Sequence, residues 1–254
     1  MNLLSKIEEY LSSSKKFALV TIVDVKGSTP RQIGARMIVF SNGSIEGTIG
    51  GGKIEYDIQK DSQYLIRHSQ SCLKEYSLNK ERGLLCGGKM SVFIEVFKPK
   101  EKIIIFGAGH IGKALYKLAS VLDFEIIIID QRKEFAKKDI FPNAKKIICK
   151  SPMEAIKELN INKNSYIVIV THGHEHDYII LKNIIKSSVV YIGMIGSKNK
   201  IKSIFNKLRV TGISQNLIKK IYAPIGLNLG GDSPEEIALS ILAEIVSIKN
   251  RRKK

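Results

Sequence analysis

The sequence predicts an α/β protein with a smaller N-terminal α+β domain and a C-terminal domain built on a parallel sheet. Two observations lead to this fold class. In the second half, the apolar runs 103–106, 125–130 and 166–170 alternate with helical stretches, which is typical of parallel strands buried on both faces. In the first half, strand-like segments are separated by short turns, as in an antiparallel sheet.

The N-terminal elements can be placed in order. An amphipathic helix over residues 1–13 contains two glutamates, which argues against a signal peptide. Strands are expected at 17–25, 36–40, 44–49, 73–78 and 90–97, with a helix at about 53–68. Asn42 and Gly43 separate the second strand from the third, and an Asn-Gly pair favours a hairpin because both residues tolerate positive φ.

The polar segment 98–102 contains Pro99 and precedes the change of pattern, so we expect domains at 1–98 and 99–254. In the second domain, strands at 145–149 and 189–193 continue the series. Ser151 and Ser233 are each followed by proline and, three residues on, by glutamate, which predicts two capped helix starts. The final helix should cover about 234–248.

Composition limits the partners. The formal charge of +17 would suit nucleic acid, but the basic residues are scattered and no nucleic-acid-binding motif accompanies them. No apolar run is long enough to span a bilayer. The three cysteines form no C-x-x-C pair and indicate a reducing compartment. We therefore expect a cytoplasmic protein with neither a nucleic-acid nor a membrane partner.

A glycine fingerprint carries the clearest chemistry. Gly107, Gly109 and Gly112 follow a strand and open a helix, and Asp130 ends the next strand. This spacing predicts a Rossmann-like nucleotide site, with phosphate at the turn and the carboxylate on a ribose hydroxyl. Tight packing without a ligand is the alternative. Asp130 favours an unphosphorylated ribose, whereas Arg132 leaves a phosphorylated one open.

A histidine-rich loop follows strand 166–170. His172, His174, His176 and Asp177 lie where the strand leaves the carboxyl edge of the sheet, at which ligands of such sheets bind. The string resembles a metallo-β-lactamase zinc motif, but its aspartate comes after the third histidine. We expect a polar loop that contacts a cofactor, and no bound metal.

Two further loops and one cysteine are candidates in the first domain. Arg31, in GSTPR, and the triple glycine 50–52, after Thr48, could bind an anion, or form ordinary turns. Glycines flank Cys86 on its far side and leave its sulfur approachable, although a small buried cysteine is the alternative. Cys72 and Cys149 are predicted to be packing cysteines.

Taken together, the segments GSTPRQIGARM, GTIGGGKIE, LCGGKMSVFIE, GAGHIGKAL, THGHEHD, YIGMIGSKNK and PIGLNLGGDSPEEIALSILAEI resemble the xanthine dehydrogenase accessory factor family, in the same order. Matched positions that the resemblance implies as site residues are Arg31, Gly50, Gly51, Gly52, Cys86, Gly107, Gly109, Gly112, Asp130, His172, His174, Asp177, Gly196 and Ser197. Gly173 and His176 depart from the family pattern, which often has an acidic residue between the first two histidines.

The resemblance implies a non-catalytic chaperone. Such a protein binds and protects the molybdenum cofactor, a molybdopterin in mononucleotide or dinucleotide form, with Cys86 as a molybdenum or sulfur contact. It assists sulfuration with a cysteine desulfurase and inserts the cofactor into an apo molybdenum hydroxylase, and a homodimer is expected. The alternatives are an NAD-dependent oxidoreductase that binds NAD(P) at the same site, with His172 or His174 as acid or base, and a regulatory nucleotide sensor.

Overall fold

The structure is a computed structural model that describes residues 3–13, 15–77 and 88–252. The chain divides into two compact units, residues 1–99 and 100–254. Each unit has its own sheet and its own buried cores, so each is described by itself. No helix in these ranges is both long and apolar enough to cross a bilayer.

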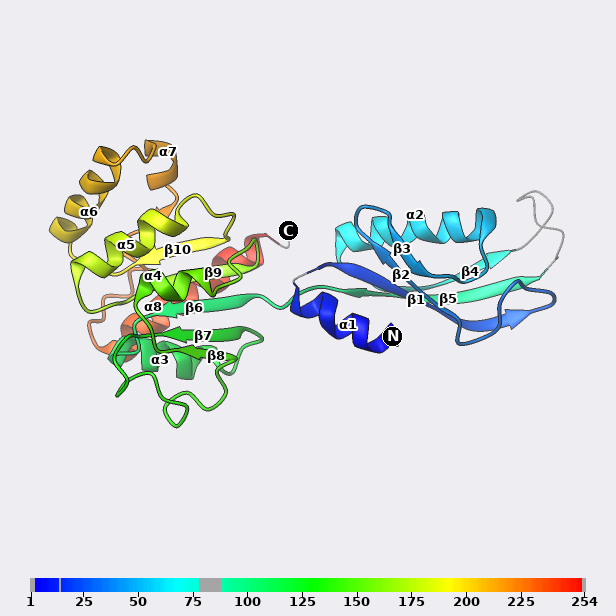
Figure 1. The fold of residues 1–254 in the computed structure, drawn as a ribbon, viewed down its shortest axis with the longest axis horizontal. Coiled ribbons are helices and arrows are strands. Elements are labelled where there is room, and N and C mark those ends of the chain that lie inside the picture. Colours follow the sequence, from blue (N-terminus) through cyan, green and yellow to red (C-terminus); the bar gives the residue numbers. More distant parts are fainter. Residues whose placement is uncertain (1–2, 14, 78–87, 253–254) are drawn as a thin grey trace. The chain divides into compact units, whose positions relative to one another are not determined.

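The first unit is an antiparallel sheet with one helix on each face (Figure 1). Its elements are α1 (Leu3–Ser12), β1 (Phe17–Lys26), β2 (Arg36–Phe40), β3 (Ile45–Gly47), α2 (Gly52–His68), β4 (Cys72–Ser77) and β5 (Lys89–Phe97). The strand order is β3-β2-β1-β5-β4. Because side chains alternate along β1, Val20 packs in the core beneath α2 and Leu19 packs beneath α1.

The Asn-Gly turn between β2 and β3 is confirmed. The Gly43 amide donates to the carbonyl of Phe40 at 2.9 Å, and the Phe40 amide donates to the carbonyl of Ser44 at 2.9 Å. Gly43 has φ 89°, in the region that favours glycine. The hairpin brings β3 and the glycine-rich segment after it back toward the start of α2.

The second unit confirms the predicted parallel sheet. Its elements are β6 (Lys102–Phe106), α3 (His110–Ala119), β7 (Glu125–Ile129), β8 (Lys146–Ile148), α4 (Pro152–Lys157), β9 (Ser165–Ile169), α5 (His174–Ile184), β10 (Tyr191–Met194), α6 (Lys198–Val210), α7 (Gln215–Ile218), β11 (Ile221–Tyr222) and α8 (Pro234–Arg251). The strand order is β11-β10-β9-β6-β7-β8, and every pairing is parallel. The two-residue strand β11 was not predicted.

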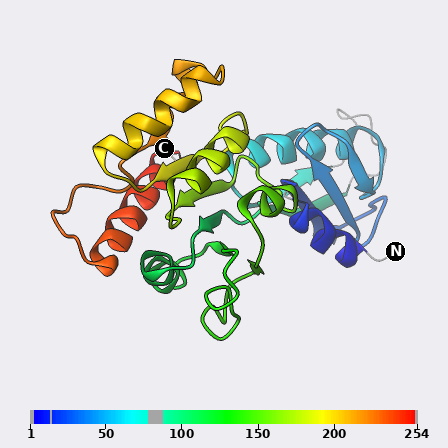
Figure 2. The same cartoon turned by 60° about the vertical axis from the view of Figure 1, so that its left-hand side comes forward.

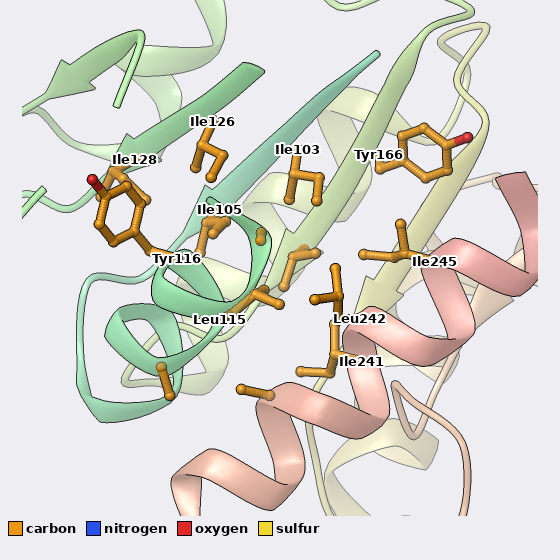
Figure 3. Packing of buried hydrophobic residues seen from close by; sticks show 14 of the residues in the cluster. Ile103, Ile105, Leu115, Tyr116, Ile126, Ile128, Tyr166, Ile241, Leu242 and Ile245 are labelled. Atoms are coloured by element: carbon orange, nitrogen blue, oxygen red, sulfur yellow. The ribbon is translucent and has the colours of Figure 1, made fainter. Parts of the chain in front are cut away.

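Helices cover both faces of this sheet, as the apolar runs predicted (Figure 2). Along β6, Ile103 and Ile105 pack with α3 and α8, whereas Ile104 and Phe106 pack with α4, α5 and α6. Figure 3 shows the first of these cores, in which Ile103 and Ile105 face Leu242 and its neighbours on α8. Burial on both faces explains why the strand sequences are continuously apolar.

The chain order sets the position of the ligand crevice. The first three strands, β6, β7 and β8, run outward in one direction, and the chain then crosses back so that β9 pairs with the other side of β6. This is the strand order of dinucleotide-binding sheets, in which ligands bind where the order reverses, outside the carboxyl ends of the strands. The crevice is therefore expected beside the ends of β6 and β9.

The two predicted helix caps are confirmed. The Ser151 hydroxyl accepts from the Glu154 amide at the start of α4, and the Ser233 hydroxyl accepts from the Glu236 amide at the start of α8. Each glutamate returns a bond to its cap residue, which completes a capping box.

Candidate functional site

The three fingerprint glycines meet three different steric requirements. Gly107 has φ 114°, and a Cβ there would lie 2.4 Å from the carbonyl oxygen of Val170. A Cβ on Gly112 would lie 2.0 Å from the carbonyl oxygen of Gly107, so only glycine lets α3 pack against the turn. Around Gly109, by contrast, no heavy atom of the described residues lies within 4 Å of the Cβ position. Gly109 therefore leaves open space at the start of α3, where a ligand phosphate would approach the helix.

A pocket of about 190 Å³ adjoins this turn. Its walls come from the carboxyl ends of β6, β7 and β9 and from the segment after β8. Among the lining residues are Gly107, Asp130, Arg132, Lys150, His172 and His176. The structure thus brings together the glycine turn, the acidic residue and two histidines, which are far apart in the sequence.

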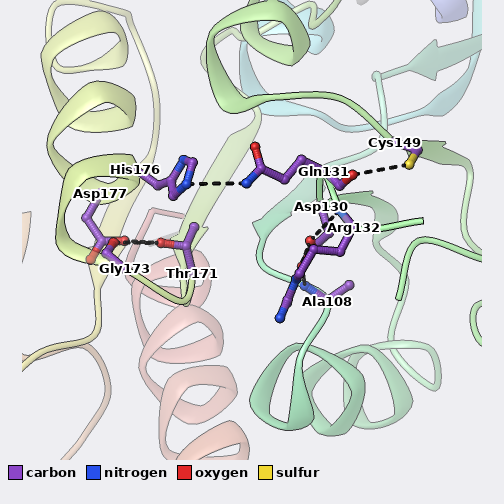
Figure 4. A network of polar contacts seen from close by, with 9 residues as sticks. All are labelled: Ala108, Asp130, Gln131, Arg132, Cys149, Thr171, Gly173, His176 and Asp177. Carbon is purple, nitrogen blue, oxygen red and sulfur yellow. Dashed lines mark hydrogen bonds and ion pairs between the residues drawn. The ribbon is translucent and has the colours of Figure 1, made fainter. Parts of the chain in front are cut away.

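Asp130 and Arg132 form a closed pair on one wall (Figure 4). Arg132 donates from Nε to Asp130 Oδ1 at 2.9 Å and from Nη2 to Oδ2 at 2.7 Å. The Ala108 amide donates to Oδ2 at 2.9 Å, which ties the carboxylate to the glycine turn. Burial would raise the pKa of Asp130, but these hydrogen bonds and the guanidinium charge outweigh it and hold the pKa below its ordinary value.

The histidine loop places two of its three rings at the pocket. His172 is exposed and lines it, and His176 lines it from the first turn of α5. His176 Nε2 lies 3.5 Å from Nε2 of Gln131, and the two side chains point toward each other in Figure 4. His174 is the first residue of α5, and only its backbone is described.

Asp177 anchors this loop and does not reach the ligand space. Its side chain is fully buried, and Oδ1 accepts from the Thr171 hydroxyl at 2.5 Å. Its other oxygen forms an ion pair with Lys200 of α6. Asp177 therefore fixes the turn that carries His172, and the sequence did not reveal Lys200 as its partner.

Gly196 and Ser197 lie at the carboxyl end of β10 and start α6. The Ser197 hydroxyl accepts from the Lys200 amide at 3.3 Å, so it caps the helix. Among the described residues, neither Gly196 nor Ser197 lines the pocket beside the glycine turn.

The prediction that Cys149 is a packing cysteine is wrong. β8 ends at Ile148, so Cys149 lies just beyond the strand and is exposed. Its thiol lies 3.7 Å from the carbonyl oxygen of Gln131. Cys72 is half-buried against the core beneath α2. Cys86 lies outside the described residues.

The candidate loops of the first unit pack against one another. A Cβ on Gly50 would lie 2.5 Å from Cγ of Pro30, and one on Gly88 would lie 2.3 Å from the carbonyl oxygen of Ser28. The segments 27–31, 47–52 and the chain at residue 88 therefore meet at one end of the antiparallel sheet. Arg31 is exposed there.

In the structure, a carboxylate of the chain already binds the Thr48 hydroxyl and two of the neighbouring backbone amides. Glu55 accepts from the Thr48 hydroxyl at 2.5 Å and from the amides of Ile49 and Gly51 at 3.0 and 3.1 Å. Burial would raise the pKa of Glu55, but these hydrogen bonds lower it overall. Sequence reasoning missed Glu55, although an acid in the first turn of α2 was visible.

An antiparallel α+β unit joined to a Rossmann-type unit with an open glycine turn defines the class: a two-unit protein whose second unit has the Rossmann-type fold. A family model described as the XdhC Rossmann domain matches residues 103–245, and one described as the XdhC and CoxI family matches residues 10–77. The chain belongs to this XdhC family, which confirms the resemblance stated from the sequence.

Three named proteins are similar to the chain in sequence. It is 32% identical over 98% of its length to the uncharacterized protein YqeB of Escherichia coli (strain K12), and 31% identical over 63% of its length to a probable subunit of xanthine dehydrogenase from Bacillus subtilis (strain 168). The chain spans 47% of each of these two proteins, about half. It is 21% identical over 95% of its length to the molybdenum cofactor insertion chaperone PaoD of Escherichia coli (strain K12), of which it covers 86%.

A crystal structure described as that of a xanthine dehydrogenase from Bacillus halodurans shares the fold. It matches with a TM-score of 0.56 at 23% sequence identity, and the match covers all of this chain and 97% of that one.

Proposed function

We propose that this chain binds the molybdenum cofactor and delivers it to a molybdenum hydroxylase of the xanthine dehydrogenase type. The observation that carries the proposal is the open turn at Gly109 in a chain of the XdhC family, because a helix N-terminus behind such a turn can bind the phosphate of a pterin. The name of the relative PaoD gives the class of cargo. The proposal includes two domains with different roles, an accessory domain at residues 1–98 and a nucleotide-binding domain at residues 99–254.

The described residues suit a phosphorylated cargo. The N-terminus of α3 points its amides toward the space in front of Gly109. Arg132 and Lys150 line the pocket wall, each paired with a carboxylate, and their remaining N–H groups can donate to a phosphate. His172 and His176 supply neutral or cationic hydrogen-bond donors on the side of β9. The phosphate of a molybdopterin, or the pyrophosphate of its dinucleotide form, would lie on the turn.

The sulfur chemistry of the proposal rests on Cys86. A thiolate is a soft ligand and suits a molybdenum centre, and two glycines follow Cys86 in the sequence. In sulfuration, the persulfide of a cysteine desulfurase would transfer its outer sulfur to the Cys86 thiolate and leave the desulfurase as its thiol, so that Cys86 would hold sulfur close to the bound cofactor. Delivery itself needs no catalysis, since the apo-hydroxylase only has to bind the cofactor more tightly. We propose a homodimer as the working form.

A second candidate function is an NAD(P)-dependent oxidoreductase. The observation in its favour is that His172 and His176 both line the pocket beside the glycine turn, where an acid or base would act. It predicts turnover of a nicotinamide substrate, which carriage of a cofactor does not.

The test is purification of the full chain, without oxygen, from a host fed with molybdate, followed by assays of bound molybdenum and pterin. Carriage predicts both in near-equal amounts, with loss of both in Gly109→Val. A chain that carries neither, or that carries them undiminished in the variant, would contradict the proposal. Reduction of NAD(P) by the same preparation with hydroxylated substrates would favour the second candidate.

A further inference from the structure

The positive charge of the second unit is concentrated where the chain has no acidic residue. Residues 178–231 contain nine of the chain's 41 basic residues and none of its 24 acidic residues. This fifth of the chain therefore carries +9 of the formal charge of +17. The segment includes most of α5 and all of α6 and α7, which are neighbours in Figure 1.

Carboxylates of the chain do not neutralise these cations. Lys200 pairs with Asp177, but the other eight basic residues of the segment are exposed and form no ion pair with a described residue. Elsewhere exposed lysines have local partners, as Lys74 has in Asp61. Exposed like charges in one region repel, and carboxylates supplied by a partner would remove that repulsion. The exposed basic residues of 178–231 are called the basic surface below.

A groove of about 670 Å³ lies between α5 and α6 within the basic surface. Tyr178 of α5 and Lys207 of α6 line it, together with Val210, whose side chain is 88% exposed. Glu175 lines the groove from the first turn of α5, and the next residue, His176, lines the pocket beside the glycine turn. The groove and that pocket therefore share the first turn of α5 as a wall.

The groove and its cations suit an acidic protein better than a nucleic acid, a membrane or a second copy of the chain. A phosphate backbone repeats its charge at every nucleotide and would bring it against Glu175, whereas a protein can place an uncharged side chain there. A helix that inserts into a membrane needs a broad apolar face, but Val210 is the one exposed apolar residue of α6, a helix described in full. A second copy would bring positive charge against positive charge.

We propose that the basic surface and the α5–α6 groove dock an acidic face of the protein that receives the cofactor. The proposal rests on the proposed function in one respect, that the recipient is a molybdenum hydroxylase. A recipient bound here contacts α5, whose first turn also carries His176 at the pocket, so the cofactor has a short path between the two proteins. The unpaired cations also steer an acidic partner toward this side of the chain, which raises the association rate at low salt.

The test compares two double variants of the full chain that change its net charge equally. Lys202→Glu/Lys207→Glu reverses two exposed cations of the basic surface. The control, Lys117→Glu/Arg251→Glu, reverses two exposed cations on α3 and α8, which cover the other face of the sheet. Binding to an apo molybdenum hydroxylase of the xanthine dehydrogenase type is measured at low and at physiological salt. The basic-surface variant should bind about tenfold more weakly or worse, mainly through slower association, with a smaller salt dependence, and the control should stay within about twofold of wild type.

Both variants should keep the urea midpoint and the cofactor content of wild type, because the changed side chains are exposed and do not line the pocket beside the glycine turn. Should a glutamate variant fail to fold, the same four positions changed to alanine give the comparison.

The proposal is overturned if the wild-type chain does not bind the apo-hydroxylase, or if the basic-surface variant binds it as tightly as the control does. It is also overturned if the basic-surface variant loses binding to a DNA duplex or to phosphatidylglycerol vesicles and keeps binding to the hydroxylase. The delivery proposal is measured separately by molybdenum and pterin content, so a chain that carries both and does not dock here contradicts the docking surface alone.

Discussion

Two glycines of one turn should respond to substitution in opposite ways. Gly109 has φ −71° and ψ −163°, which any residue adopts, and its Cβ position is open. Gly109→Ala should therefore leave the free energy of unfolding unchanged or raise it by up to about 1 kcal/mol, since alanine restricts the unfolded chain. At Gly112 the added Cβ would lie 2.0 Å from a backbone oxygen, so Gly112→Ala should lower it by about 1–3 kcal/mol.

Cofactor affinity, unlike stability, should depend strongly on Gly109. Gly109→Val fills the space in front of the α3 amides, so the affinity for cofactor should fall at least tenfold, or about 1.4 kcal/mol, in a protein as stable as wild type. Urea unfolding gives the first quantity and equilibrium binding the second. Undiminished binding by Gly109→Val would place the phosphate elsewhere, and a Gly112→Ala protein of wild-type stability would refute the packing argument.

Three more predictions concern other parts of the chain. Lys200→Ala leaves a fully buried carboxylate on α5 without its cation and should cost about 3 kcal/mol in urea unfolding, and a change below about 1 kcal/mol would show that the pair is not needed. Cys86→Ser should keep the fold but lower cofactor retention or activation of the hydroxylase. Cys72→Ser and Cys149→Ser should leave cofactor retention and hydroxylase activation unchanged, and equal effects in all three variants would remove the sulfur role. The depressed pKa of Asp130 means that this group contributes stability above its ordinary value of 3.8, and the contribution disappears as the pH falls through the lower folded pKa. Thermal unfolding should therefore show the advantage of wild type over Asp130→Asn shrinking below pH 3.8, and a constant difference would contradict it.

The parts of the site that sequence predicts are those fixed by local geometry. A glycine with positive φ, a turn between strand and helix, and a capping serine depend on neighbours within a few residues, so Gly107 and Ser233 could be assigned at once. The parallel sheet was equally predictable, because burial on both faces leaves a continuous apolar run such as 103–106.

The parts that sequence misses depend on side-chain partners or on where a strand stops. Asp130 and Arg132 are two residues apart, and only the side-chain rotamers show that they pair. The partner of Asp177 is on another helix. The apolar segment around Cys149 predicts a packed side chain, but the strand ends one residue earlier and leaves Cys149 exposed.

The most direct test of the central claim is transfer in a purified system. The chain, loaded with sulfurated cofactor and kept without oxygen, is mixed with an apo molybdenum hydroxylase, and the rise of hydroxylase activity is followed together with the loss of molybdenum from the chain. Our account predicts that both occur with matching stoichiometry, and that Gly109→Val, purified from the same host, transfers little. Activation of the hydroxylase to the same extent by free cofactor alone, or by the Gly109→Val protein, would contradict it.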